Sequence, residues 1–246
     1  RQNFHWLQNE QVNGQPRANL AAVDAVTNTV LPWPATAVPT TTTIAIAHDV
    51  WVYVYLDATG PLRRIHAVTG QIDPAFQVVR PFGGLSFAVG NGRLYIGVFS
   101  DAQPNAPRLL IHVIDPATDT LQFLVSVPAS PAFAVTGDTV YLASPVRSVA
   151  TDIGTISAYD LRTGVRVAAP AVSGQLNGIS VADGRLFAYG GTFSSGGSTR
   201  VGAAEVVRPA GFTAWDTGAW RLDNADSIID RGVFDVRAHG NLLVTL

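Results

Sequence analysis

The chain has 246 residues, of which 47% are hydrophobic and 14% charged, and its formal net charge is −2. A nearly neutral chain without a cluster of basic residues lacks the positive surface that attracts nucleic acid or an anionic membrane, so we expect neither as a partner. The absence of cysteine excludes disulfides, thiolate metal sites and a thiol nucleophile. No apolar run reaches the ~18–20 residues of a membrane-spanning helix, so we predict no membrane span.

The residue types favour strands over helices. The chain contains neither lysine nor methionine, and Glu10 and Glu205 are its only glutamates. These three types are strong helix formers, whereas the abundant valine, threonine and aromatic residues fit a pleated sheet, so we predict an all-β fold. Without methionine, residue 1 is not a translation start, and we expect the chain to be processed or cut from a longer protein.

Two kinds of turn recur along the chain at one spacing. The first is Thr-Gly or a variant of it, which begins at residues 27, 69, 118, 163 and 210, that is, every 42–49 residues. The second is a two-residue turn that leads into an apolar strand, at residues 48–49, 91–92, 137–138, 183–184 and 239–240. Two independent turns that keep the same spacing indicate a structural repeat.

Each repeat reads as four short strands. In the second repeat these are "GLSFAV", "RLYIGVF", "RLLIHVID" and "TLQFLVSV", between residues 84 and 127. Asn91-Gly92 predicts a type I′ hairpin between the first two strands, because both residues tolerate positive φ. A repeated four-stranded antiparallel meander of about 40–50 residues is typical of a β-propeller blade.

The two ends of the chain complement each other. If residues 1–33 and 233–246 form one composite blade, the ring closes with five blades and covers two open sheet edges. We therefore predict a single five-bladed propeller domain over residues 1–246, in which residues 241–246 pair with residues 19–24. The alternative is a fragment of a longer propeller, cut at both ends.

The first two strands of each repeat are expected to supply the core, as layers of small and aliphatic residues. We expect the following side chains to be buried: Ile46, Phe87, Tyr95, Val135, Tyr141, Val181, Phe187 and Val236.

Two stretches carry a family resemblance. "RANLAAVDAVTNTVLPW" (residues 17–33) and "GQIDPAFQ" (residues 70–77) resemble the repeats of bacterial surface and secreted β-propellers, namely the quinoprotein-like group and repeats with the signature Gly-x-hydrophobic-Asp-x-x-Phe. The resemblance implies a propeller architecture and an extracellular or cell-surface location. The tryptophan-docking motifs of quinone-dependent dehydrogenases are not evident, so we assign no cofactor.

An aspartate recurs three residues before the Thr-Gly turn, as Asp24, Asp115 and Asp160. A short acid at this position accepts hydrogen bonds from the N–H groups of the next turn, so we interpret it as structural. Calcium is the alternative, but one carboxylate per turn falls short of the six to eight oxygens that calcium takes. The five histidines show no metal-ligand spacing, and "SSGGS" at residues 194–198 reads as a flexible connection, so we assign no metal site.

The strands that would line the central channel contain almost no acid. They read "IAIA", "LSFAV", "FAV", "ISVA" and "VFDVR", in which Asp235 is the only acid and Arg237 is near it. Glycoside cleavage needs two carboxyl groups about 5–10 Å apart, so we assign no catalytic residue.

One stretch interrupts the repeat. Residues 214–232, "AWDTGAWRLDNADSIIDRG", form an insertion before the last half-blade. Function is often added where a scaffold does not need the residues, and tryptophan beside aspartate suits sugar recognition. The candidate ligand-binding residues are Trp6, Trp215, Trp220, Asp223, Asp226 and Asp230. The alternative is a plug over the seam where the ring closes.

From these patterns we expect a non-catalytic β-propeller module that binds a protein or glycan partner or serves structural assembly. A glycan-active hydrolase or lyase on a five-bladed propeller is the alternative. A lectin with one site per blade is a third hypothesis, although it requires similar rim loops in every blade and these loops differ.

Overall fold

The computed structural model describes residues 2–6, 11–12, 15–16, 20–24, 27, 29–31, 44–48, 50–55, 61–76, 78, 85–100, 107–115, 118, 120–130, 132–144, 154–182, 184–208, 211–216, 236–239 and 242–245. All regular elements in this part of the chain are strands, and they pair antiparallel. The all-β prediction is therefore confirmed. Contacts divide the chain into two compact units, residues 1–81 with 115–121 and residues 82–114 with 122–246, and each is described by itself.

The first unit contains three small sheets. Strand β1 (Gln2–Trp6) pairs with β4 (Leu20–Asp24), and β2 (Gln11–Val12) pairs with β3 (Gln15–Pro16). The third sheet has the order β5-β6-β7, formed by β5 (Ile44–His48), β6 (Trp51–Tyr55) and β7 (Leu62–His66). The strand at residues 2–6 was not predicted.

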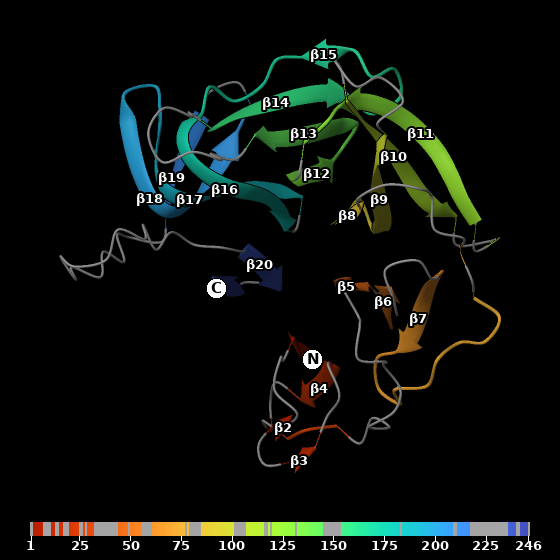
Figure 1. Ribbon diagram of the computed structural model, residues 1–246. Coiled ribbons are helices and arrows are strands. Elements are labelled where there is room, and N and C mark those ends of the chain that lie inside the picture. The colour runs from red at the N-terminus through yellow and green to blue at the C-terminus, as the bar shows by residue number, and fades with distance from the viewer. Residues whose placement is uncertain are drawn as a thin grey trace. The chain divides into compact units, whose positions relative to one another are not determined.

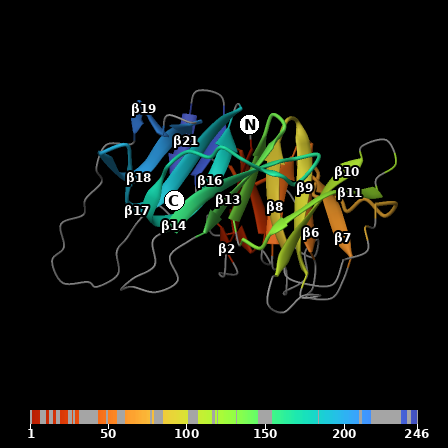
Figure 2. The same ribbon diagram turned by 90° about the horizontal axis from the view of Figure 1, so that it is seen from above.

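The four-stranded meander that was predicted from the second repeat belongs to the second unit, except for residues 115–121 between the ends of β10 and β11. Its strands lie in chain order, as Figure 1 and, from above, Figure 2 show: β8 (Leu85–Gly90), β9 (Arg93–Ser100), β10 (Arg108–Asp115) and β11 (Thr120–Pro128). Asn91 and Gly92 both have positive φ, 51° and 66°, which confirms the type I′ hairpin.

The third and fourth repeats share one sheet. Its strands are β12 (Ala132–Thr136), β13 (Thr139–Ser144), β14 (Gly154–Asp160), β15 (Arg166–Val167), β16 (Ser173–Ala182), β17 (Arg185–Ser195), β18 (Ser198–Val207) and β19 (Gly211–Asp216). Separate blades were expected, but Ser173 and Gly174 at the start of β16 pair with β14 on one side, while β16 pairs with β17 along its length on the other. Register shifts interrupt the pairing of β16 with β17 on both sides of Leu176. A last hairpin joins β20 (Val236–His239) and β21 (Leu242–Thr245).

Residues 194–198 correct a second expectation. They form the end of β17, a two-residue turn and the start of β18, rather than a flexible connection. Gly196 and Gly197 have φ of 55° and 82°, the backbone that a type I′ turn requires at both central positions.

The core lies between successive repeats. On β13, Val140 and Leu142 pack into one buried cluster with β9, β10 and β11 residues, while Tyr141 and Ala143 pack into another with β16 and β17 residues. A strand covered on both faces needs apolar residues at every position, which explains the continuous run "VYLA".

The burial predictions are confirmed for four side chains, because Tyr95, Val135, Tyr141 and Phe187 are buried. Phe87 and Val181 are only half-buried, which corrects the prediction for the first strands of two repeats. In β8 the more deeply buried positions are Ala88 and Gly90, on the opposite face from Phe87. The side chains of Ile46 and Val236 lie outside the described residues.

The first strands of successive repeats lie together, since β8, β12 and β16 contact one another. A Cβ atom on Gly90 would collide with the carbonyl oxygen of Val135, so glycine permits the close approach of β8 and β12. A hydrogen bond also links β12 to the turn after β16, because the Thr136 hydroxyl donates to the Gly184 carbonyl at 3.0 Å.

Candidate functional site

The turn after β14 is held by Asp160, one of the recurring aspartates. Its Oδ1 accepts hydrogen bonds from the N–H groups of Arg162 (3.0 Å) and Thr163 (2.8 Å) and from the Thr163 hydroxyl (2.9 Å). These bonds, the Thr163 N–H first, lower the pKa of Asp160, because they stabilise the charged carboxylate. The structural interpretation of the recurring aspartate is confirmed at this position.

His66 occupies the equivalent position after β7 and performs the same role. Its Nδ1 accepts from the N–H groups of Val68 and Thr69, both at 3.3 Å. The carbonyl of His66 also accepts from Gly70 at 2.9 Å, as that of Asp160 does from Gly164. An imidazole nitrogen thus replaces the carboxylate oxygen in the first unit.

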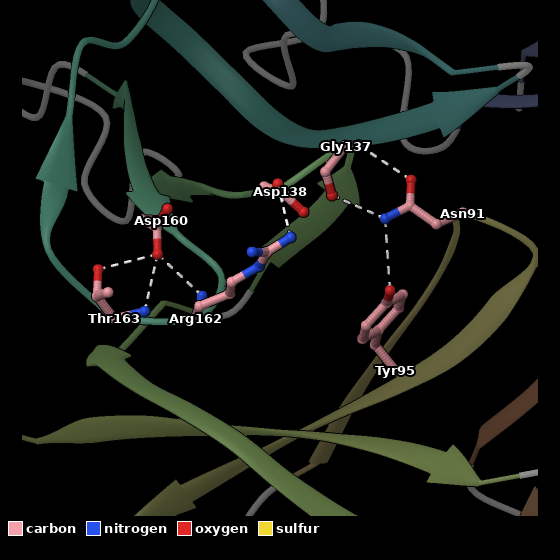
Figure 3. Close-up of polar contacts among 7 residues, drawn as sticks. All are labelled: Asn91, Tyr95, Gly137, Asp138, Asp160, Arg162 and Thr163. Carbon is pink, nitrogen blue, oxygen red and sulfur yellow. Dashed lines mark hydrogen bonds and ion pairs between the residues drawn. The ribbon is translucent and has the colours of Figure 1, made fainter.

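The Asp160 turn places Arg162 against the turn between β12 and β13 (Figure 3). Its Nη2 lies 3.1 Å from Asp138 Oδ2, and the side chains of this ion pair are 76% and 67% exposed. The Leu161 N–H donates to the Asp138 carbonyl at 2.8 Å. Two residues of the turn after β14 therefore contact the turn between β12 and β13.

Asn91 links the β8–β9 turn to the same place. Its Nδ2 donates to the Gly137 carbonyl at 2.8 Å, and its Oδ1 accepts from the Gly137 N–H at 2.9 Å (Figure 3). Nδ2 also lies 3.5 Å from the Tyr95 hydroxyl. The amide group is thereby used on both its donor and its acceptor side.

These turns and β11 enclose an open groove of about 560 Å³, which we call the turn groove. It is lined by Asn91, Arg93, Tyr95, Phe123, Leu124, Gly137, Asp138, Leu161 and Arg162.

Phe123 is the prominent apolar group of the turn groove, with 57% of its surface exposed. Its ring meets His112 edge-on, with centroids 5.5 Å apart. Burial lowers the pKa of His112, and its Nδ1 lies 3.2 Å from the Leu110 carbonyl. Because a carbonyl can only accept, Nδ1 carries a proton and donates to it.

Charge in the turn groove is unbalanced. Arg162 is paired with Asp138, whereas no ion-pair or hydrogen-bond partner of the exposed Arg93 guanidinium is found among the side chains that the structure describes, which do not include that of Asp115. Among these side chains, the groove therefore offers one positive charge without a partner and an exposed aromatic ring.

A second polar cluster lies in the first unit, around Arg64. Its guanidinium carbon is 4.5 Å from the centre of the Trp51 ring and 4.6 Å from that of Phe76, and Nη2 contacts Asp73 Oδ2 at 2.7 Å. The side chains of Arg64 and Asp73 are each only 16% exposed. Arg64 lowers the pKa of Asp73.

This cluster accounts for the signature at residues 70–77. Gly70 has a φ of 69°, Ile72 bridges to Ile65, and the Phe76 side chain is fully buried. Asp73 Oδ1 also accepts from the Ala75 N–H at 2.9 Å. Every defining residue of the signature thus holds the chain against β7.

The predicted site residues lie on different strands or outside the described residues. Trp6 lies on β1, Trp215 on β19 and Arg237 on β20, while their side chains lie outside the described residues. The following predicted residues are also outside the described part: Trp220, Asp223, Asp226, Asp230 and Asp235.

Sequence reasoning missed Arg93 and Phe123. Strand alternation places Phe123 on the same face as the buried Val125 and Val127, so the pattern predicts a core residue. No local feature of the sequence distinguishes the exposed Phe123 from a buried residue.

In the described ranges, no three side chains of the metal-ligating types His, Cys, Asp or Glu come together. No helix in the same part of the chain is long and apolar enough to cross a membrane. Comparison of the chain with known protein families and with curated proteins gives no match.

Proposed function

We propose that the chain is a non-catalytic, extracellular or cell-surface β-propeller module of five blades, closed by residues 1–33 and 233–246, that binds a protein or glycan partner. The propeller is supported by the meander β8–β11, by the mutual contact of β8, β12 and β16, and by cores on both faces of β13. The resemblance of residues 17–33 and 70–77 to surface-propeller repeats supports the location.

The non-catalytic role rests on one observation: every acidic side chain that the structure describes is already engaged. Asp73 binds Arg64, Asp138 binds Arg162, and Asp160 holds its own turn. Glu205 receives Arg185 Nε and Nη2 at 2.7 Å each and the Thr213 hydroxyl at 2.9 Å.

These contacts also lower the pKa of Glu205, Asp73 and Asp160, with Arg185 the main cause for Glu205. A general acid in glycoside cleavage needs a raised pKa instead. The described first strands β8, β12 and β16 contribute no Asp or Glu.

The test is to incubate the purified chain with a panel of polysaccharides and to measure both binding and the release of reducing or unsaturated ends. We expect binding without turnover. Turnover that is lost in Asp235→Asn, the one acid of the predicted channel, would establish the hydrolase or lyase alternative.

The insertion at residues 214–232 is the second surface to test. If the insertion binds the partner, Trp220→Ala should weaken the binding free energy by ~1–3 kcal/mol, as loss of an aromatic anchor does. The stability of the fold should not change. Unchanged binding with reduced thermal stability would identify the insertion as a plug.

A further inference from the structure

We propose that the turn groove binds a short acidic segment of a partner protein in extended conformation, with a carboxylate on Arg93 and an apolar side chain on Phe123. This inference rests on the proposed role as an interaction module and gives it a site and a partner chemistry.

Charge complementarity indicates an acidic ligand. Of the three charged residues that line the groove, Arg162 and Asp138 neutralise each other, and Arg93 remains. A planar guanidinium pairs with a carboxylate through two parallel hydrogen bonds, which gives both affinity and orientation.

The apolar half of the groove indicates a side chain next to that carboxylate. Phe123 is 57% exposed, and Leu124 and Leu161 are half-buried on the same surface. A ring held edge-on by His112 loses little conformational freedom when an apolar side chain covers it.

The groove favours a peptide over a glycan because the groups that recognise sugar hydroxyls are occupied. The Asn91 amide is bonded to Gly137 on both sides, and the Asp138 carboxylate is bonded to Arg162. A neutral sugar would find the Phe123 ring but few free acceptors beside it.

The position of β11 indicates an extended segment. Phe123 and Leu124 are consecutive and point to opposite faces of the strand, so a groove that touches both reaches the backbone edge between them. In the pairing that the structure describes, β11 is the terminal strand of its sheet. Its residues, "TLQFLVSVP", carry no charge that would repel an added strand.

The probe is a set of fluorescein-labelled, C-amidated peptides of eight residues, in which threonine fills every position except two variable ones. One position holds Asp, Asn or Arg, and the other holds Leu or Ser. Fluorescence anisotropy should show that the Asp/Leu peptide binds at least ~10-fold more tightly than the Asn/Leu and Asp/Ser peptides.

Variants of the protein then locate the site. Arg93→Gln should lower the affinity for the Asp/Leu peptide by ~10–30-fold, and Arg93→Glu should shift the binding preference to the Arg/Leu peptide. Phe123→Ser should remove the advantage of Leu over Ser. Controls are Arg166→Gln, at an exposed arginine, and Val165→Ser, at an exposed apolar residue; neither residue lines the groove. Both should bind like the wild type.

Equal binding of the Asp, Asn and Arg peptides, or affinity that is unchanged in Arg93→Glu, would overturn the proposal. So would the absence of binding by all peptides at ~1 mM. A glycan array signal that is lost in Arg93→Gln would replace the peptide by a sugar and leave the interaction module intact. Turnover of a polysaccharide would instead overturn the proposed function itself.

Discussion

Asn91 is the only non-glycine residue with positive φ in the part of the chain that the structure describes, and its amide also joins two hairpins. Asparagine is suited to both roles, since it tolerates the left-handed region and carries one donor group and one acceptor. Two variants separate these contributions.

We expect Asn91→Gly to lose ~1 kcal/mol of unfolding free energy through the missing hydrogen bonds to Gly137. Asn91→Ala should lose a further ~1 kcal/mol, because alanine is strained at this φ. Urea unfolding at pH 7 measures both. Equal stability of Asn91→Ala and the wild type would show that neither role matters.

Asp73 gives the fold a pH dependence whose sign follows from its lowered pKa. Its ordinary value is 3.8, and Arg64 holds the folded-state pKa below that. The carboxylate therefore stabilises the fold above pH ~4, and this contribution is lost as the pH falls through the folded-state pKa.

We expect the wild type to be more stable than Asp73→Asn at pH 7, and the difference to shrink as the pH is lowered from 4 towards 2. Chemical unfolding of both proteins at several pH values measures it; other acids titrate in both and cancel in the difference. A constant difference across this range would contradict the lowered pKa of Asp73.

At the scale of the element, β8 and β12 are equivalent first strands with different burial. Phe133 on β12 is buried, with 4% exposed, whereas Phe87 on β8 is half-buried. The removal of a ring costs the transfer free energy of the buried atoms and that of the cavity left behind, and both are smaller at a partly open position.

Phe133→Ala should therefore cost ~3–5 kcal/mol, and Phe87→Ala no more than about half of that. The two variants share one chemical change, so their thermal or urea unfolding compares the sites directly. An equal loss in both would mean that Phe87 contributes to the core as the sequence pattern predicts.

At the scale of the whole molecule, ring closure by residues 241–246 against residues 19–24 would join the two units, and it stays a prediction. The described partner of β4 is β1, and that of β21 is β20. Closure therefore requires that β4 and β21 pair through the edges that do not face β1 and β20.

Because the chain has no cysteine, introduced pairs report on this contact without interference. Ala22→Cys is combined in turn with cysteine at Leu242, Leu243 or Val244. Since neighbouring strands bring Cβ atoms to about 4.5–5.5 Å, we expect one combination to oxidise far faster than the others on a non-reducing gel. In guanidinium, where all three should react alike, the preference must disappear. Equal slow rates in the native protein would contradict closure.

What the sequence determined by itself is the local structure. Asn91-Gly92 specifies its hairpin, Asp160 and Thr163 specify their turn, and the apolar runs of each repeat specify strands. These features depend on φ preferences, short-range hydrogen bonds and side-chain shape, which a few neighbouring residues decide.

Only the tertiary structure decided which faces meet. β16 is shared by two repeats, and the Arg64 cluster brings together residues from separate segments of the chain. The half-burial of Phe87 and the exposure of Phe123 likewise depend on what covers each side chain. Strand alternation assigns a residue to one of two faces but does not say what covers that face. The turn groove, which four separate segments line, was therefore invisible to sequence patterns, although each of its turns was predicted.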